Sequence, residues 1–213
     1  MKLYGYFRSS AAFRVRIALN LKGLAYDTAA IHLRRNDQNK PDYLRVNPQG
    51  LVPALEDGGL TLIQSMAILE YLDEILPEPP FLPKQPADRA RVRALADIVA
   101  CDIHPLNNLR VLRYLMRELG HDEPAIAQWY NHWIAAGFEA LEPLLAHDAR
   151  TGKFCHGDSP GLADIALVPQ VVNAERYRFD LAQFPTLVRI YENCMRLEPF
   201  TAAHPRNQPD YEP

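Results

Sequence analysis

The chain has 213 residues, of which 48% are hydrophobic and 23% charged, a composition ordinary for one large or two small globular domains. The net charge of -3 gives no reason to expect a nucleic acid or an anionic membrane as partner. No stretch reaches the roughly 18 uninterrupted apolar residues of a spanning helix. The three cysteines are widely spaced and form no Cys-x-x-Cys pair, which excludes a disulfide framework and favours a reducing, cytoplasmic location.

Residues 1–78 alternate strand-like and helical patterns. Gly23 is suited to end the first helix, and the Asp57-Gly58-Gly59 turn predicts a hairpin. In chain order the pattern predicts a strand over 2–7, a helix over 10–23, a strand over 26–33, a short helical connection over 41–50, hairpin strands over 52–55 and 60–64, and a helix over 65–76 capped by Ser65.

A cluster of prolines between Leu76 and Ala87 predicts an interdomain linker over 79–87, because proline interrupts helices. Residues 88–213 form the second domain, and no convincing strand pattern occurs in them. The helices predicted there are 88–119, 123–147, 162–177 and 186–196. The sequence therefore predicts an α/β domain followed by an all-helical domain.

The stretch YFRSSAAFRVRIAL, from Tyr6 to Leu19, passes from a strand through Arg8-Ser9-Ser10 directly into a helix. A helix N-terminus presents unpaired N–H groups and about half a positive charge. Two interpretations are open: one serine merely caps the helix, or the serines and Arg8 mark an anion site.

Several motifs resemble those of one family: SSAAFRVRIAL, NPQGLVPAL, IQSMAILEYL, CDIHPLNNLRVL, LVPQVVNAERYRFDL and HPRNQPD. In this order, from Lys2 to Asp210, they resemble the zeta class of soluble glutathione transferases. The resemblance implies the glutathione transferase fold, a thioredoxin-like α/β N-terminal domain plus an all-α C-terminal domain. The chain departs from the family pattern at Ala11, where the family has cysteine, and at Phe13, where it has tryptophan.

The resemblance implies glutathione as cofactor. Ser9 is the first choice to donate a hydrogen bond to its sulfur, with Ser10 as the alternative. If Pro53 follows a cis bond, the Val52 main chain is exposed to pair with the cysteinyl part. The glutathione-binding residues so implied are Ser9, Ser10, Gln38 at the glycyl end, Val52, Gln64 and Ser65 at the γ-glutamyl end, His104 and Asn108.

Arginines suit a substrate with two separated carboxylate or enolate groups, because each guanidinium offers paired N–H donors. The substrate-binding residues implied are Arg8, Arg110, Arg176 and His104, and the catalytic residues are Ser9, Ser10 and Arg8. Cys101 and His104 share a helix face, but two ligands do not make a zinc site, so no metal is expected.

The hypothesis is a glutathione-dependent isomerase that converts maleylacetoacetate or maleylpyruvate, small diketo dicarboxylates, to the fumaryl isomer. Reversible addition of the thiolate makes the double bond single and lets it rotate. Two alternatives stay open: a zeta-type transferase acting on small α-halo acids, which would use the same sulfur site, or a non-catalytic glutathione-binding protein. The resemblance also implies a homodimer.

Asp164 lies at the third position of a predicted helix whose cap position is Gly161 rather than serine or threonine. Half of a capping box therefore remains. We expect Asp164 to be buried, to accept backbone N–H bonds and to serve folding rather than catalysis.

Overall fold

A computed structural model describes residues 1–212. The chain divides into two compact units. The first comprises Met1–Phe81 together with the segment from Met195 onward, and the second comprises Leu82–Cys194. The sequence analysis had placed residues 195–213 in the helical domain, whereas the structure groups this segment with the N-terminal unit.

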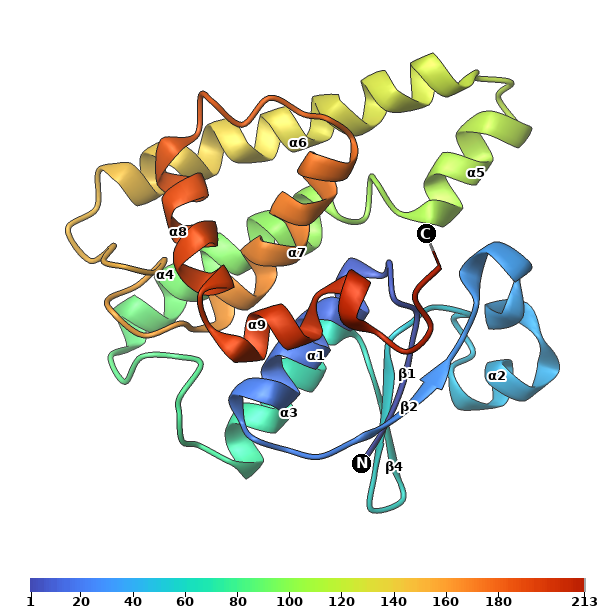
Figure 1. Cartoon of the computed structure of the whole chain (residues 1–213), viewed down its shortest axis with the longest axis horizontal. Helices are drawn as coiled ribbons and strands as arrows, with labels where there is room; N and C mark the ends of the chain where they lie inside the picture. The colour runs from blue at the N-terminus through green and yellow to red at the C-terminus, as the bar shows by residue number, and fades with distance from the viewer. Residues whose placement is uncertain (213) are drawn as a thin grey trace. The chain divides into compact units, whose positions relative to one another are not determined.

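The first unit contains a four-stranded sheet and its helices (Figure 1). Its elements are β1 (Lys2–Gly5), α1 (Ser10–Leu21), β2 (Asp27–Ala30), η1 (Leu33–Arg35), η2 (Asp37–Asn39), α2 (Pro41–Val46), β3 (Ala54–Asp57), β4 (Leu60–Ile63), α3 (Ser65–Ile75), α9 (Glu198–Ala203) and η4 (Pro205–Asn207). The order of elements predicted for residues 1–78 is confirmed, and Gly23 follows α1 with φ +64°. Helix α9 was not predicted.

The sheet order is β2-β1-β3-β4, with β1 parallel to β2 and β3 antiparallel to both of its neighbours. Ala54, at the start of β3, pairs with Tyr4 near the end of β1 and with Ile63 at the end of β4. One edge of the sheet therefore carries the ends of β1 and β4 and the beginning of β3.

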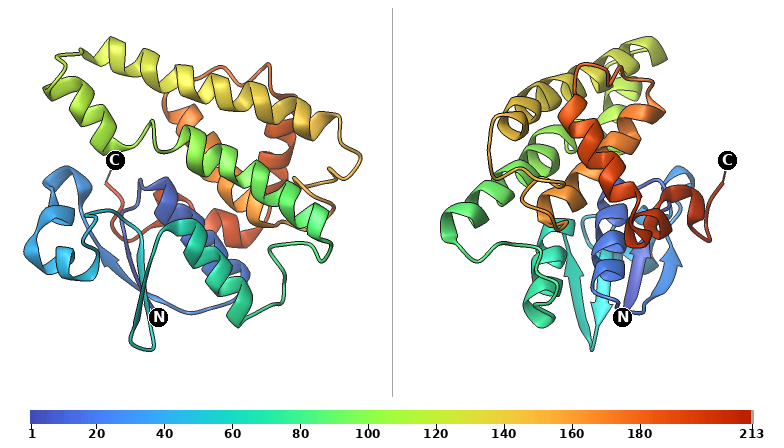
Figure 2. Two further views of the ribbon diagram at one scale, coloured as in Figure 1. Left: turned by 180° about the vertical axis from the view of Figure 1, so that it is seen from behind. Right: turned by 60° about the vertical axis from the view of Figure 1, so that its left-hand side comes forward.

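Helices α1 and α3 lie side by side in the first unit (Figures 1 and 2). Phe13 and Ile17 of α1 and Leu69 of α3 are at most 1% exposed, so their burial removes large apolar surfaces from water. Helix α9 packs on α1, where Asn20 donates to the Pro199 carbonyl at 3.0 Å. The C-terminal segment is thus part of the core that supports α1.

Within the residues described, the second unit contains helices and one isolated β-bridge, between Thr151 and Gly157. Its elements are α4 (Pro86–Asp97), the π-helix η3 (Ile98–Ile103), α5 (Leu109–Arg117), α6 (Glu123–Ala146), α7 (Leu162–Arg176) and α8 (Pro185–Met195). The single helix predicted over 88–119 is wrong. Pro105, just after η3, has no N–H to donate, and Asn108 has an extended backbone, φ -67° and ψ 144°, before α5 begins.

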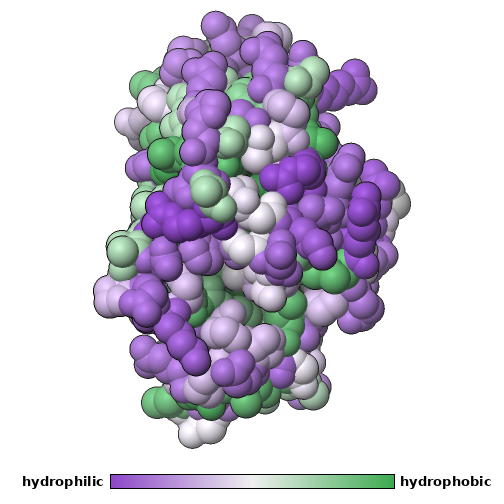
Figure 3. All heavy atoms as spheres, turned by 90° about the vertical axis from the view of Figure 1, so that its left-hand side faces the viewer, coloured by the Kyte–Doolittle hydropathy of each residue, from purple (hydrophilic) through white to green (hydrophobic). Residues whose placement is uncertain are grey.

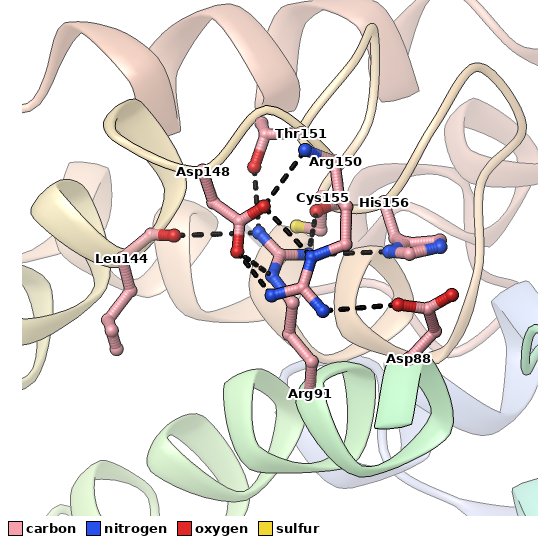
Figure 4. A network of polar contacts seen from close by, with 8 residues as sticks. All are labelled: Asp88, Arg91, Leu144, Asp148, Arg150, Thr151, Cys155 and His156. Atoms are coloured by element: carbon pink, nitrogen blue, oxygen red, sulfur yellow. Dashed lines mark hydrogen bonds and ion pairs between the residues drawn. The ribbon is translucent and has the colours of Figure 1, made fainter. Parts of the chain in front are cut away.

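Arg91 of α4 fastens the loop that follows α6 (Figure 4). Its guanidinium donates to Asp148 Oδ2 at 2.8 Å, to Thr151 Oγ1 at 2.8 Å and to the Cys155 carbonyl at 2.9 Å. Its side chain is only 10% exposed, so the charge is compensated inside the unit rather than by water.

Asp164 holds the same loop from the N-terminus of α7. It is 1% exposed and accepts the Cys155 N–H at 2.8 Å and the Gly161 N–H at 2.9 Å. Burial raises the pKa of Asp164, and the backbone hydrogen bonds oppose that rise. The predicted burial of Asp164 and its hydrogen bonds to backbone N–H groups are confirmed.

Two observations describe the surface. On the face drawn in Figure 3, hydrophilic residues cover most of the area and hydrophobic ones are interspersed among them. Among residues 1–212, none of the helices combines the length and apolar character needed to cross a membrane.

Candidate active site

Three segments that carry predicted site residues start or end at one edge of the sheet. Residues 6–10 follow β1, residues 51–53 precede β3, and residues 64–65 follow β4. Because Tyr4, Ala54 and Ile63 are paired across the sheet, the register itself brings these segments together.

Ser9 occupies the N-cap of α1 with an extended backbone, φ -70° and ψ 115°. Its Oγ accepts the Ala12 N–H at 3.2 Å, so its own O–H can donate elsewhere. Ser10 is the first helical residue and is 7% exposed. The first turn of α1 has no acidic residue that would neutralise the partial positive charge of the helix. The cap interpretation and the anion-site interpretation of the serine pair are therefore compatible.

Ser65 is the first residue of α3 and is 6% exposed. The N-cap is Gln64, so the prediction that Ser65 caps this helix is wrong by one position. Gln64 has φ +70°, a conformation that costs a residue with a side chain about 1–3 kcal/mol. Arg14, 2% exposed in α1, donates to Ser65 Oγ at 3.3 Å and so connects the two helices.

The Val52–Pro53 bond is cis, as expected from the resemblance. The preceding carbonyl of Leu51 accepts the Tyr43 hydroxyl at 2.6 Å and the Asn47 amide at 2.7 Å. The Val52 main chain makes no hydrogen bond to any other residue in the range 1–212, and Val52 is half-buried. A fixed loop therefore presents a peptide group that is available to a ligand.

Gln38 in η2 is 7% exposed, and its Nε2 donates to Asn36 Oδ1 at 3.2 Å. Its Oε1 is buried without a partner among the residues that the structure describes. Gly50 packs so closely that a Cβ there would lie 3.2 Å from the Gln38 carbonyl oxygen. On the other side of the loop, Gln64 donates to Gln49 Oε1 at 2.9 Å. Gln38 and Gln64 thus both flank the loop before β3.

Arg8 lies in the turn between β1 and α1. Its guanidinium packs over the Phe7 ring, 5.1 Å from the centroid. Within the described part of the chain it forms no ion pair, so its charge is available to an anion near Ser9.

Four site residues were predicted in the helical unit. Three of them lie between η3 and the first turn of α5, and the fourth, Arg176, is the last residue of α7. His104 is the C-cap of η3, which ends at Ile103. Asn108 is the N-cap of α5, and its Oδ1 accepts the Arg110 N–H at 3.1 Å. The Arg110 side chain is exposed. The Arg176 guanidinium lies over the Tyr177 ring at 5.0 Å, at the end of α7.

Arg176 has aromatic neighbours that fix its environment. Tyr177 stacks on Tyr130 with the ring centroids 3.6 Å apart. Burial raises the pKa of Tyr130 to about 12, while the adjacent Arg176 cation works in the opposite direction.

The first unit thus offers two helix N-termini without acidic residues in their first turns, serine hydroxyls, a free peptide group and a buried amide oxygen. This set suits an anionic ligand with peptide-like groups. Within residues 1–212, no three His, Cys, Asp or Glu side chains gather as metal ligands.

Two supporting residues escaped the sequence analysis. Arg14 holds Ser65, and Asn47 holds the loop before Val52. The Asn47-Pro48 pair is a turn signal that could have indicated the second, since asparagine side chains bond nearby backbone in turns. Arg14 gave no signal, because arginines on amphipathic helices usually face water.

Comparison with known proteins agrees with this geometry. Residues 1–74 match the family described as glutathione S-transferase, N-terminal domain, and residues 127–206 match glutathione S-transferase, C-terminal domain. A probable maleylacetoacetate isomerase of Vibrio cholerae is 50% identical over 98% of this chain and 97% of its own.

Two solved structures are also similar over 100% of both chains. One is a holo maleylpyruvate isomerase described as a bacterial zeta-class glutathione S-transferase, with 49% identity and a TM-score of 0.98. The other is a maleylacetoacetate isomerase of Methylobacterium extorquens AM1 with bound malonate and glutathione, with 45% identity and a TM-score of 0.97. The chain belongs to the zeta class of the glutathione S-transferase family.

Proposed function

We propose that this protein is a glutathione-dependent cis–trans isomerase that converts maleylacetoacetate or maleylpyruvate to the fumaryl isomer. The observation that carries the proposal is the meeting of Ser9, the Val52 peptide and Ser65 at one sheet edge. The full-length similarity to isomerases of these two substrates supports the reaction. The relative with bound glutathione and malonate supports a thiol beside a dicarboxylate.

The residues present fit glutathione along its length. The N-terminus of α3, with Ser65 and Gln64, is suited to the γ-glutamyl carboxylate and amine. The free Val52 peptide is suited to pair with the cysteinyl main chain. The unpartnered oxygen of Gln38 needs a donor, so it suits the glycyl N–H rather than the glycyl carboxylate.

Bound glutathione would supply a thiolate nucleophile for reversible addition to the alkene. Ser9 stabilises that charge by donating its hydroxyl proton in a hydrogen bond, while the N-terminus of α1 adds its dipole. Ser10 is the alternative donor. His104 and Asn108 are the contacts proposed from the helical unit.

The substrate carries two anionic groups, which we assign to Arg8, Arg110 and Arg176, with His104 as a further contact. Arg8 has no ion-pair partner among the described residues and directly precedes Ser9, so it is the arginine best placed to stabilise enolate charge. Arg8→Ala and Arg110→Ala should each lower kcat/KM for the dicarboxylate by about 10- to 100-fold while glutathione affinity changes little. If both variants keep full efficiency, the arginine assignment is wrong.

The function itself is tested by mixing the purified protein with glutathione and each substrate, and following the absorbance of the enol. Isomerisation of either substrate that depends on glutathione supports the proposal, and the ratio of the two kcat/KM values identifies the preferred one. Consumption of small α-halo acids without isomerisation would instead assign a conjugating transferase. Binding of glutathione without ionisation of its thiol would assign a non-catalytic binding protein.

We further propose a homodimer in the cytoplasm. Large apolar side chains are exposed in both units, among them Leu60 at 54%, Tyr114 at 58% and Leu119 at 55%. Such side chains are common at contacts between subunits. Sedimentation equilibrium at micromolar concentration should give twice the 24.2 kDa chain mass, and a single-chain mass would refute the dimer.

A further inference from the structure

The turn between β1 and α1 is held by the C-terminal tail, which we define as residues 208–212. Figure 1 shows the red C-terminal segment beside the blue start of α1. The tail belongs to the same compact unit as the turn, although the two are about 200 residues apart in sequence: the bond from Phe7 to Asp210 spans 203 positions.

Both polar groups of the Phe7 backbone are bound by charged side chains. Its N–H donates to Asp210 Oδ2 at 2.9 Å, and its carbonyl accepts Arg16 Nη2 at 3.1 Å. The turn is closed by the Ser9 N–H, which donates to the Tyr6 carbonyl at 2.9 Å. Since Phe7 is 1% exposed, water cannot easily replace the carboxylate of Asp210 as the acceptor.

Asp210 also compensates a buried cation. Arg16 is 3% exposed and donates from Nε to the Ala203 carbonyl at 2.9 Å. Burial lowers the pKa of Arg16 to about 10, and Tyr26 and Asp210 act in the opposite direction. The Asp210 carboxylate therefore binds the Phe7 N–H and also favours the charged form of Arg16, which binds the Phe7 carbonyl.

Side-chain contacts continue the same arrangement. The Tyr211 ring meets the Phe7 ring edge-on, with centroids 5.5 Å apart and planes at 82°. The Arg8 guanidinium packs on the same ring. The tail thus contacts both the backbone and the ring of Phe7, the residue that directly precedes Arg8 and Ser9.

We propose that Asp210 is a positioning residue for Arg8 and Ser9, acting through the Phe7 peptide. The inference rests on the proposed function. Without the carboxylate the buried Phe7 N–H would lose its acceptor, and the turn would relax to find another. Displacements of about 1 Å in catalytic groups can cost roughly 100-fold in rate.

Three variants separate this role from general stability. Asp210→Ala removes the acceptor, whereas Asp210→Asn keeps a carbonyl oxygen for the Phe7 N–H. Glu212→Gln is the matched control, because it removes one negative charge from the same tail. Glu212 contacts His32 at 3.0 Å and Arg35 at 2.8 Å, outside the turn.

The readouts are hydrogen–deuterium exchange of the peptide containing Phe7, the pKa of the glutathione thiol in the complex, and kcat/KM. For Asp210→Ala we expect faster exchange, a thiol pKa raised by about 1 unit, and kcat/KM lowered by about 10- to 100-fold. Glu212→Gln should stay within about threefold of wild type in kcat/KM, with the wild-type thiol pKa. Asp210→Asn keeps the acceptor but loses the charge that faces Arg16, so its loss should be smaller than that of Asp210→Ala.

Wild-type exchange and thiol pKa in Asp210→Ala would overturn the inference, as would an equal loss in Glu212→Gln. If Asp210→Ala does not fold, Asp210→Glu keeps the charge but displaces the acceptor by one methylene. A raised thiol pKa then supports the inference, and an unchanged one overturns it. A wild-type protein that ionises glutathione but isomerises neither substrate refutes the proposed function alone. One that does not bind glutathione refutes both.

Discussion

Ser9 combines two hydrogen-bonding roles in one hydroxyl, and substitution can separate them. Its oxygen accepts the Ala12 N–H at 3.2 Å as the cap of α1, and its proton is available to a bound thiolate. Ser9→Ala removes both. Loss of the cap should cost about 1 kcal/mol of unfolding free energy, which lowers Tm by about 2–4 °C for a chain of this size.

The second loss appears at the sulfur. A hydrogen bond to a charged group contributes about 1.5–3 kcal/mol, and one pKa unit corresponds to about 1.4 kcal/mol. Ser9→Ala should therefore raise the thiol pKa of bound glutathione by about 1–2 units. Ser9→Asp keeps an acceptor for the cap but offers a negative charge instead of a donor. It should retain Tm while raising the thiol pKa further.

The assay is the ultraviolet difference absorbance of the thiolate, recorded as a function of pH with saturating glutathione. Ser10→Ala is the control of equal size in the same turn. A wild-type thiol pKa in Ser9→Ala would refute the assignment of the sulfur contact to Ser9. A raised value in Ser10→Ala alone would transfer the role to Ser10.

Further predictions concern stability and reactivity. A Cβ on Gly137 would lie 2.2 Å from Ile103 Cδ1. Gly137→Ala should therefore lower the free energy of unfolding measured in urea. The cost of overpacking, about 1–3 kcal/mol, exceeds the roughly 1 kcal/mol gained in helix propensity. Adding Ile103→Ala should reverse the sign of the Gly137→Ala effect, and additive losses would contradict this contact. Asp164→Ala leaves one buried and one partly buried N–H group without their acceptor and should cost roughly 2–5 kcal/mol in the same assay. A cost no larger than that of an exposed substitution would contradict the folding role. Of the three cysteines only Cys101 is exposed, and burial raises the pKa of the other two thiols, so a thiol reagent should modify one group per native chain and the rest only in denaturant.

Local sequence signals predicted much of the first unit. Gly23 predicted the end of α1, and the structure gives it the positive φ that glycine adopts most easily. Asp57-Gly58-Gly59 predicted the turn that joins β3 to β4. The candidate hydrogen-bond donors to the ligand could be predicted because short local residue patterns, Ser9-Ser10 and Gln64-Ser65, indicate helix N-termini. The cis bond before Pro53 came from family resemblance, since the local residues alone do not specify it.

What the sequence could not supply depends on contacts far apart in the chain. The periodicity of residues 88–119 is continuous through η3, so only Pro105 could indicate the break before α5. Arg14 and Arg16 are charged residues in α1 that the fold buries, and their partners Ser65 and Ala203 lie on α3 and α9. Pairings of this kind follow from tertiary packing rather than from propensity.

The order of synthesis gives the C-terminal segment a further consequence. The helical unit is one continuous stretch, Leu82–Cys194, so it contains all of its own residues without the C-terminal segment. The α/β unit precedes the helical unit in the chain but is completed only after it, because α1 packs on α9. A nascent or truncated polypeptide that ends before residue 195 therefore exposes the apolar flank of α1, and isolated expression of residues 1–81 should yield an aggregation-prone fragment rather than a glutathione-binding module.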